Sequence, residues 1–270
     1  MVVVLVGVGA DTTNAHPTPP VYEDGRFEYV PIPEFRGPEG TVEESTYGNS
    51  SLRHNGGNLA DLLEYIEPGN YRLDGSEMER WPLHQDPNFD HLTYGETTSR
   101  AAYTSTLSEL SEDDVLAFYT GLDDGSGRKH RYVIGYFTVN RVVDLRDVDG
   151  RSFEELPKEE KKSLISDHRH NAHAKRYLAS GELHDGDGVV ILDGKEPGGL
   201  LDRAFRISKS VNGHYYLRDD LQESWNPVPS GRETRNAYLG GIKQIHELKV
   251  ESDVFVSDCV EKYSFPGTDG

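Results

Sequence analysis

The chain has 270 residues and a formal net charge of −19, which arises from 47 acidic and 28 basic side chains. This length is sufficient to bury a substantial core, and the single cysteine, Cys259, excludes an internal disulfide and a cysteine-cluster zinc site. The acidic excess argues against the usual mode of nucleic-acid binding, in which Lys and Arg neutralise phosphates.

The basic residues are mostly arginine, with 18 Arg and 10 Lys. An acidic, lysine-poor composition is typical of proteins kept soluble in concentrated salt, where the Debye length falls to about 3 Å at 1 M. We therefore expect a halophilic archaeon or its virus as the source. In that solvent, nucleic-acid binding would depend on stacking and hydrogen bonds more than on counterion release.

At the N-terminus, the apolar run Val2–Val6 is followed by Gly7 and Gly9, as in a dinucleotide-binding turn. The third glycine is missing, and Pro17 and the prolines after it prevent the helix that such a turn requires. The stretch instead predicts a buried strand that ends in a polar loop, where a ligand site and a solvated surface loop are equal alternatives. The polar residues of this loop are Asp11, Thr12, Thr13, Asn14 and His16.

Further along, we expect an extended segment with a turn at Asp24-Gly25, a loop over 41–57, and one short helix over Leu59–Ile66. Residues 74–99 show no periodicity, and Ala101–Leu110 has helical spacing. Because Met1–Gly9 has too few apolar residues for a membrane span and no basic flank for a signal peptide, we expect a soluble, cytoplasmic protein.

The clearest pattern lies between residues 110 and 145. Two apolar, aromatic-rich runs, Val115–Tyr119 and Tyr132–Val143, flank a Gly/Asp loop and predict a β-hairpin with a long connection. Tyr119 and Tyr136 lie in its strands, where each either packs in the core or stacks on a base.

Two clusters of polar residues have the composition of reactive sites. "HQDPNFDH" at 84–91 supplies His84, Asp86, Asp90 and His91, a mixture able to bind a metal or to form an acid/base pair. It matches no established metal signature, and an Asp-Pro turn in which Asp86 fixes the backbone is an equal alternative.

The second cluster is "SDHRHNAHAKRY" at 166–177. On a helix, His170 and His173 would share a face, while His168 would point elsewhere. The two histidines suit a zinc ion if a distant carboxylate joins them, and they equally suit contact with a phosphate. A solvated helix capped by Asp167 is the alternative. Neither cluster has a complete ligand set at a recognisable spacing, so we expect no stoichiometric transition metal.

Near the C-terminus, the Pro/Gly-rich stretch "WNPVPSGRETRNAY" at 225–238 is exposed by composition. Its Trp225, Arg232 and Arg235 are candidates for nucleic-acid contact, because aromatic rings beside arginines stack on bases.

Several of these motifs together resemble known proteins. "VLAFYTG", then "YVIGYFTV" leading into "RVVDL", resembles the PUA-like superfamily, which includes the EVE and ASCH domains. With "PTPPVYEDGRFEYVPIPE", "PLHQDPNFDHLTYGE", "HNAHAKRYL" and "RDDLQESWNP", the chain resembles the third nucleotide-modification-associated domain family over most of residues 1–258. The resemblance implies an α+β fold with a PUA-like mixed β-barrel core, elaborated with helices and long loops. It implies a single domain over 1–258, a tail over 259–270, and work on modified DNA or RNA bases.

We therefore expect a modified or to-be-modified base to bind between the loop 9–16 and the PUA-like sheet, in an enzyme or in a non-catalytic reader. A metal-dependent hydrolase that uses the His clusters is a third possibility. The expected catalytic residues are Asp11, Asn14, His84 and Asp86. The expected nucleic-acid contacts are Thr12, Thr13, His16, Tyr119, Tyr136, His170, His173, Trp225, Arg232 and Arg235. The sequence identifies no cofactor, no oligomeric state and no preference between DNA and RNA, and no membrane partner is expected.

Overall fold

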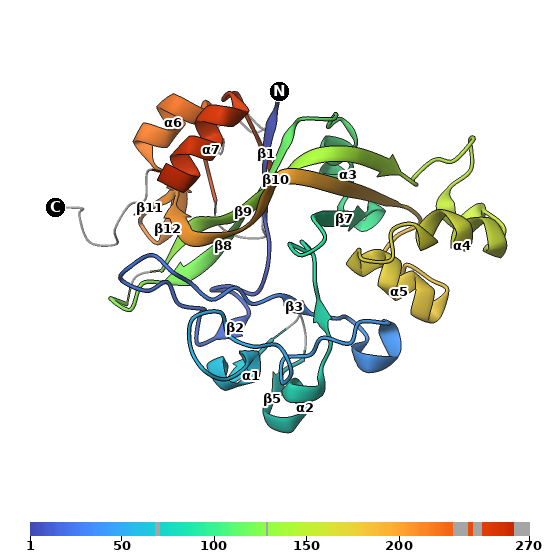
Figure 1. The fold of residues 1–270 in the computed structure, drawn as a ribbon, viewed down its shortest axis with the longest axis horizontal. Helices are drawn as coiled ribbons and strands as arrows, with labels where there is room; N and C mark the ends of the chain where they lie inside the picture. Colours follow the sequence, from blue (N-terminus) through green and yellow to red (C-terminus); the bar gives the residue numbers. More distant parts are fainter. Residues whose placement is uncertain (68–70, 128, 229–236, 240–244, 262–270) are drawn as a thin grey trace.

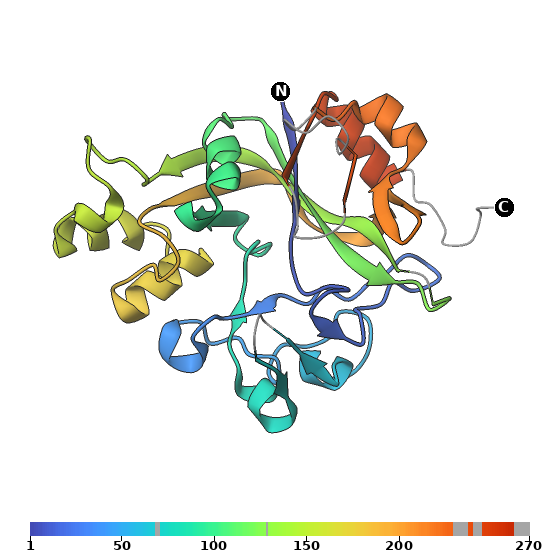
Figure 2. The same cartoon turned by 180° about the vertical axis from the view of Figure 1, so that it is seen from behind.

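The computed structural model describes the chain except residues 68–70, 128, 229–236, 240–244 and 262–270. A curled six-stranded sheet lies in the middle, with short elements of the N-terminal third on one side of it and helices around it (Figures 1 and 2). The strands are β1 (Val3–Gly7), β2 (Ala15–His16), β3 (Ile32–Pro33), β4 (Tyr65–Ile66), β5 (Leu73–Asp74), β6 (Leu83–His84), β7 (Thr93–Thr97), β8 (Val115–Asp123), β9 (Lys129–Asp144), β10 (Val189–Arg206), β11 (Ser208–Val211), β12 (His214–Leu217) and β13 (Ile245–Leu248). The α-helices are α1 (Leu59–Leu62), α2 (Gly75–Arg80), α3 (Ala101–Ser108), α4 (Lys158–Ser166), α5 (Ala172–Ser180), α6 (Asp219–Trp225) and α7 (Ser252–Glu261), and the 3₁₀ helices are η1 (Gly37–Gly40), η2 (Thr98–Arg100) and η3 (Phe153–Glu155).

The central sheet has the order β13-β1-β8-β9-β10-β7. Only β1 and β8 run parallel; the other neighbouring strands are antiparallel. The hairpin predicted from the sequence is confirmed as β8–β9, and register shifts between β9 and β10 mark bulges, which bend a sheet. The sheet is curled into a half-barrel, and its combination with the helices is compatible with the expected α+β class, while the PUA-like assignment stays a prediction.

Strand β1 is buried on both faces, which explains its unbroken apolar sequence. Val4 and Val6 pack in the cluster on one face of the sheet, together with residues of α3. Val3 and Leu5 pack in the cluster on the other face, which α6 and α7 cover. Helix α7 continues past residue 258, the expected end of the domain, and places Cys259 in that core.

Beyond β1 the chain turns without entering a helix, as the sequence predicted. Gly9 has a φ of +70°, and a Cβ there would lie 2.6 Å from the Tyr29 ring, so both the conformation and the space require glycine. No helix occurs before η1, which removes the dinucleotide-binding interpretation. The turn at Asp24-Gly25 is also confirmed, with Gly25 at a φ of +82°.

Three segments differ from the expected secondary structure. The helix expected over Leu59–Ile66 ends at Leu62, and the next residue is extended. Tyr65–Ile66 instead forms β4, which pairs with β2 on one side and β5 on the other. Residues 74–99 contain α2 and β7, and β7 gains its partner from β10, nearly a hundred residues later. Such a pairing leaves no local periodicity in the sequence.

The helix expected to follow a cap at Asp167 begins at Ala172, four residues later than expected. Asp167 is the C-cap of α4, whereas Asn171 caps α5 by accepting a hydrogen bond from the backbone N–H of His173. His170 therefore precedes α5 and does not share a helix face with His173. Within the described residues, no helix has the length and apolar character to span a membrane.

Candidate functional site

A cavity of about 500 Å³ lies where the turn after β1 meets β6, β7 and α5. Gly7, Val8, Gly9 and Asn14 form one part of its wall. The cavity has the size of a small-molecule site. It adjoins the strand-end loop, as predicted for a ligand site, but its sheet side is formed by β7 and not by the β8–β9 hairpin.

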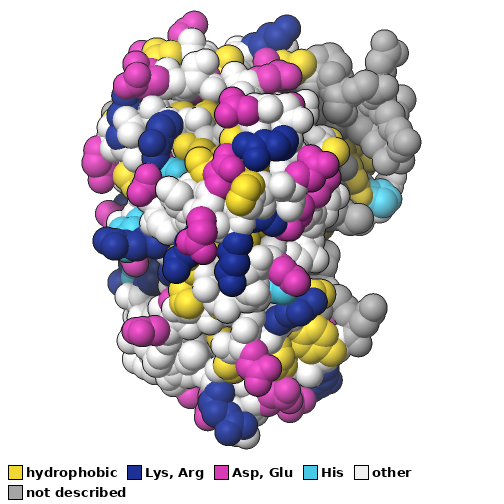
Figure 3. Space-filling model, turned by 90° about the vertical axis from the view of Figure 1, so that its right-hand side faces the viewer, with side chains coloured by type: hydrophobic (Ala, Val, Ile, Leu, Met, Phe, Trp, Pro, Cys, Tyr) yellow, Lys and Arg dark blue, Asp and Glu magenta, His cyan; other side chains and the backbone are white. Residues whose placement is uncertain are grey.

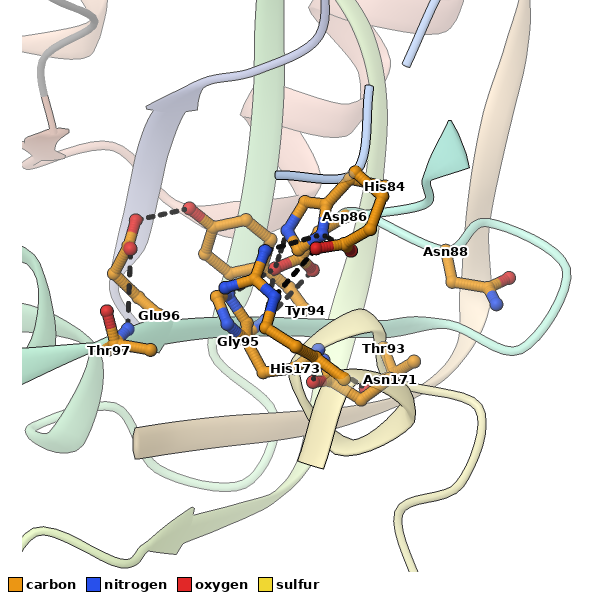
Figure 4. Close-up of polar contacts among 12 residues, drawn as sticks. His84, Asp86, Asn88, Thr93, Tyr94, Gly95, Glu96, Thr97, Asn171 and His173 are labelled. Atoms are coloured by element: carbon orange, nitrogen blue, oxygen red, sulfur yellow. Dashed lines mark hydrogen bonds and ion pairs between the residues drawn. The ribbon is translucent and has the colours of Figure 1, made fainter. Parts of the chain in front are cut away.

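His84, Asp86 and His173 face one another in the cavity wall (Figure 4). His173 Nε2 lies 3.2 Å from Asp86 Oδ2, and His84 Nε2 lies 3.9 Å from the same oxygen. One potential ligand atom from each residue lies within 4.8 Å of the other two. All three side chains are less than a tenth exposed.

His84 is oriented by a buried carboxylate behind it. Strand β6 pairs with β3, which brings His84 Nδ1 to 3.0 Å from Glu34 Oε2. Burial would raise the pKa of the Glu34 carboxyl, but the His84 hydrogen bond and the Arg176 charge outweigh it and lower the pKa to about 2. Because an ionised carboxylate only accepts hydrogen bonds, Nδ1 of His84 donates to Glu34, and Nε2 faces Asp86.

Asp86 is held from the side of β7. The backbone N–H of Gly95 donates to both of its oxygens, at 3.0 and 3.2 Å. Burial raises the pKa of Asp86 to about 7, against the opposing charge of His84 and the Gly95 hydrogen bond. A Cβ at position 95 would lie 2.9 Å from the Asn171 side chain, so glycine allows β7 to approach α5 here.

His173 comes from the first turn of α5. Burial lowers its pKa, and the Arg176 charge acts in the same direction. Its Nδ1 atom is buried and has no hydrogen-bond partner within the described chain. Its Nε2 atom is the one that faces Asp86.

A second polar group borders the cavity beside the first. Arg100 Nη1 lies 2.6 Å from Glu96 Oε2, and Tyr94 donates a hydrogen bond of 3.4 Å to the same oxygen. Burial raises the pKa of Glu96, against the charge of Arg100. Deeper in the wall, Arg176 donates from Nε to Glu34 and lies 3.1 Å from Asp185.

Four of the predicted site residues therefore meet at one cavity, namely Asn14, His84, Asp86 and His173. His170 does not join them; it stacks on His91, with ring centroids 3.7 Å apart. His16 stacks on Tyr65 outside the cavity wall.

Asp11, one of the expected catalytic residues, is buried and does not line the cavity. Oδ2 of its carboxylate lies 3.3 Å from Arg131 Nη1. Oδ1 accepts hydrogen bonds from the backbone N–H and the hydroxyl of Thr13. Thr12 accepts a hydrogen bond from Arg131. These contacts tie the loop to β9 from inside, while Thr13 and His16 remain exposed.

The aromatic candidates for base stacking are buried. Tyr119 and Tyr136 pack in the core cluster on the α6–α7 face of the sheet. Trp225 was expected in an exposed loop, but it ends α6 in the same core and donates from Nε1 to Asp258. Arg232 and Arg235 lie outside the described residues.

Sequence reasoning missed several side chains of this site. Glu34 contacts His84 across 50 residues, and no spacing in the sequence links them. Glu96 and Arg100 have the i,i+4 spacing of a helical ion pair, although Glu96 lies on a strand. The one usable signal for Glu34 was an isolated acid in an otherwise apolar, Pro-rich stretch.

Comparison with known families places the chain as a whole. The profile of the family described as nucleotide modification associated domain 3 matches residues 2–234. The chain belongs to this family. The resemblance to this family is confirmed, and the family description associates the chain with nucleotide modification. No curated protein and no solved structure matches the chain.

Proposed function

We propose that the cavity binds a modified or to-be-modified nucleobase, and that His84, Asp86 and His173 perform chemistry on it. The observation that carries this proposal is the placement of a buried acid–base group in the wall of a base-sized cavity. A reader protein needs the cavity but has no use for such a group. The enzyme is therefore favoured over the reader.

The charge of the cavity favours a base over a phosphate. The lining carries the carboxyl groups of Asp86, Glu96 and Asp185 beside only two guanidinium groups, both of which contact carboxylates. A phosphate would meet three carboxyl groups and only two guanidinium groups, which are already engaged, whereas the edge of a base meets both donors and acceptors. We infer that the sugar and phosphate stay outside the cavity, as in enzymes that extrude a nucleotide from its strand.

Phe35 supplies an apolar surface to the same cavity. Its side chain is 60 % exposed, although it belongs to the cavity wall. Stacking of a base on an aromatic ring contributes about 1–3 kcal/mol. We propose that Phe35 stacks on the entering base while Asn14 hydrogen-bonds to its edge.

The test is equilibrium binding of nucleosides, nucleotides and single-stranded oligonucleotides, followed by mass spectrometry of the recovered nucleosides. We expect saturable binding, a change in mass or structure of the base, and about tenfold weaker binding for Phe35→Ala. Val42→Ala, which truncates an exposed apolar residue outside the cavity wall, is the matched control.

Two other outcomes would contradict the proposal in different ways. Binding without conversion, with Asp86→Asn as effective as the wild type, would assign the protein as a reader. Absence of saturable binding to any of these ligands would remove the cavity as a base site.

A further inference from the structure

We propose that His84, Asp86 and His173 bind one divalent transition-metal ion, Zn²⁺ or Fe²⁺. The sequence predicted no such metal, because neither His cluster contains a complete set of ligands. The fold builds the set by taking two residues from the first cluster and one from the second.

The distances suit a shared ion. Metal–nitrogen and metal–oxygen bonds of about 2.0–2.2 Å at tetrahedral angles place ligand atoms about 3.4 Å apart. The two distances to Asp86 Oδ2, 3.2 Å from His173 and 3.9 Å from His84, lie on either side of this value. The third pair, His84 and His173, lies within the same 4.8 Å limit, so coordination requires side-chain rotations that bring the three atoms closer together.

The surroundings of the ligands are those that metal sites use. A metal-binding histidine commonly donates its other ring N–H to a carboxylate, which fixes the ring and its tautomer. Glu34 provides this carboxylate to His84. The Gly95 N–H fixes the Asp86 carboxylate in the same way.

The ligand set points to a reactive metal. Two imidazoles and one carboxylate are typical of catalytic zinc sites and of non-haem Fe²⁺ sites, which leave positions open for water or substrate. Because all three residues line the cavity, the open positions face the space that a base would enter. This last step rests on the proposed function; metal binding itself does not.

The test measures metal content and thermal stability on the full chain, purified without a histidine tag. Chelator-treated protein is incubated with Zn²⁺, with Fe²⁺ under anaerobic conditions, or with Mg²⁺, then desalted and analysed for metal. We expect about one Zn²⁺ or Fe²⁺ per chain, a raised thermal midpoint, and no retained Mg²⁺, because Mg²⁺ prefers oxygen ligands.

The variants are Asp86→Asn and His173→Gln, each expected to weaken metal affinity at least tenfold. Their matched controls come from the same two clusters but lie outside the ligand set, namely Asp90→Asn and His170→Gln. Circular dichroism without metal establishes that each variant is folded. If one variant fails to fold, the other variant and the wild type still show whether these residues bind the metal.

Retention of neither Zn²⁺ nor Fe²⁺ by the wild type, or equal retention by the folded ligand variants, would overturn the metal site. Nucleoside binding is measured separately on metal-free and metal-loaded protein. A protein that binds a nucleoside but retains neither Zn²⁺ nor Fe²⁺ would refute this inference alone. A protein that retains a metal but binds no nucleoside would refute only the proposed function.

Discussion

Asp11 and Arg131 form an ion pair inside the molecule and thereby join the loop after β1 to β9. Their closest charged atoms lie 3.3 Å apart, and both side chains are almost fully buried. Arg131 also donates to the Leu239 carbonyl and lies over the Tyr215 ring. The loop that carries Asn14 into the cavity is therefore anchored to the core by charge.

Asp11→Ala is expected to destabilise the fold by about 3 kcal/mol, because it leaves a buried arginine without its carboxylate. Asp11→Asn is the matched variant, since its amide oxygen still accepts the Thr13 hydrogen bonds. Urea denaturation measures both, and we expect Asp11→Asn to lose less stability. Equal stability of Asp11→Ala and the wild type would show that the ion pair contributes nothing to folding.

Asn14→Ala is expected to separate folding from binding. Asn14 Oδ1 accepts a hydrogen bond from the backbone N–H of Asp11, and its loss costs about 1 kcal/mol. Because Asn14 also lines the cavity, base binding should weaken while the cooperative unfolding transition persists. A variant that binds as tightly as the wild type would assign Asn14 to the loop alone.

What the sequence predicted well were features with a local cause. The β8–β9 hairpin follows from two apolar runs around a Gly/Asp loop, and the end of β1 follows from Gly7 and the prolines beyond it. His84, Asp86 and His173 were each recognised as reactive residue types.

What the sequence missed depends on contacts between distant segments. Nothing local shows that His173 joins Asp86, or that Glu34 lies behind His84. Composition also misplaced Trp225: the stretch that follows it is rich in Pro and Gly, but α6 places its ring in the core. Tertiary packing decided each of these positions.

Cys259 is expected to be unreactive in the native protein. Burial raises the pKa of its thiol well above the ordinary value, and the Asp258 charge acts in the same direction. Because the thiolate is the reactive form, labelling by a disulfide reagent should be slow in buffer and rapid in guanidinium chloride. Rapid labelling of folded protein would mean that α7 detaches from the core.

Thermal stability is expected to rise with KCl between 0.2 and 2 M. A net charge of −19 repels itself, and salt screens this repulsion. The face in Figure 3 shows acidic and basic side chains interspersed. The increase in stability with salt should therefore depend on the net charge of the protein more than on a single acidic patch. Near the isoelectric point of about 4.9 the rise should be much smaller. A flat or falling midpoint at neutral pH would argue against adaptation to high salt.

Stability is also expected to fall with acid because of His246, which is buried in β13. Burial lowers the pKa of His246 from 6.5 to about 4, although a hydrogen bond to the Tyr238 backbone opposes the shift. Between these two pH values the unfolded chain binds the proton and the native protein does not. The free energy of unfolding is therefore highest above pH 6.5 and decreases as the pH falls toward 4, by roughly 3 kcal/mol from this group.

His246→Gln tests this assignment, because glutamine keeps an N–H donor for Tyr238 and does not titrate. Urea denaturation at pH 7.5 and pH 4.5 should show a loss of stability that is smaller in the variant by about 2–3 kcal/mol. His214→Gln, which replaces an exposed histidine, should behave like the wild type. If wild type and His246→Gln lose the same stability between the two pH values, proton binding by His246 is not linked to unfolding, and the acid sensitivity belongs to other groups.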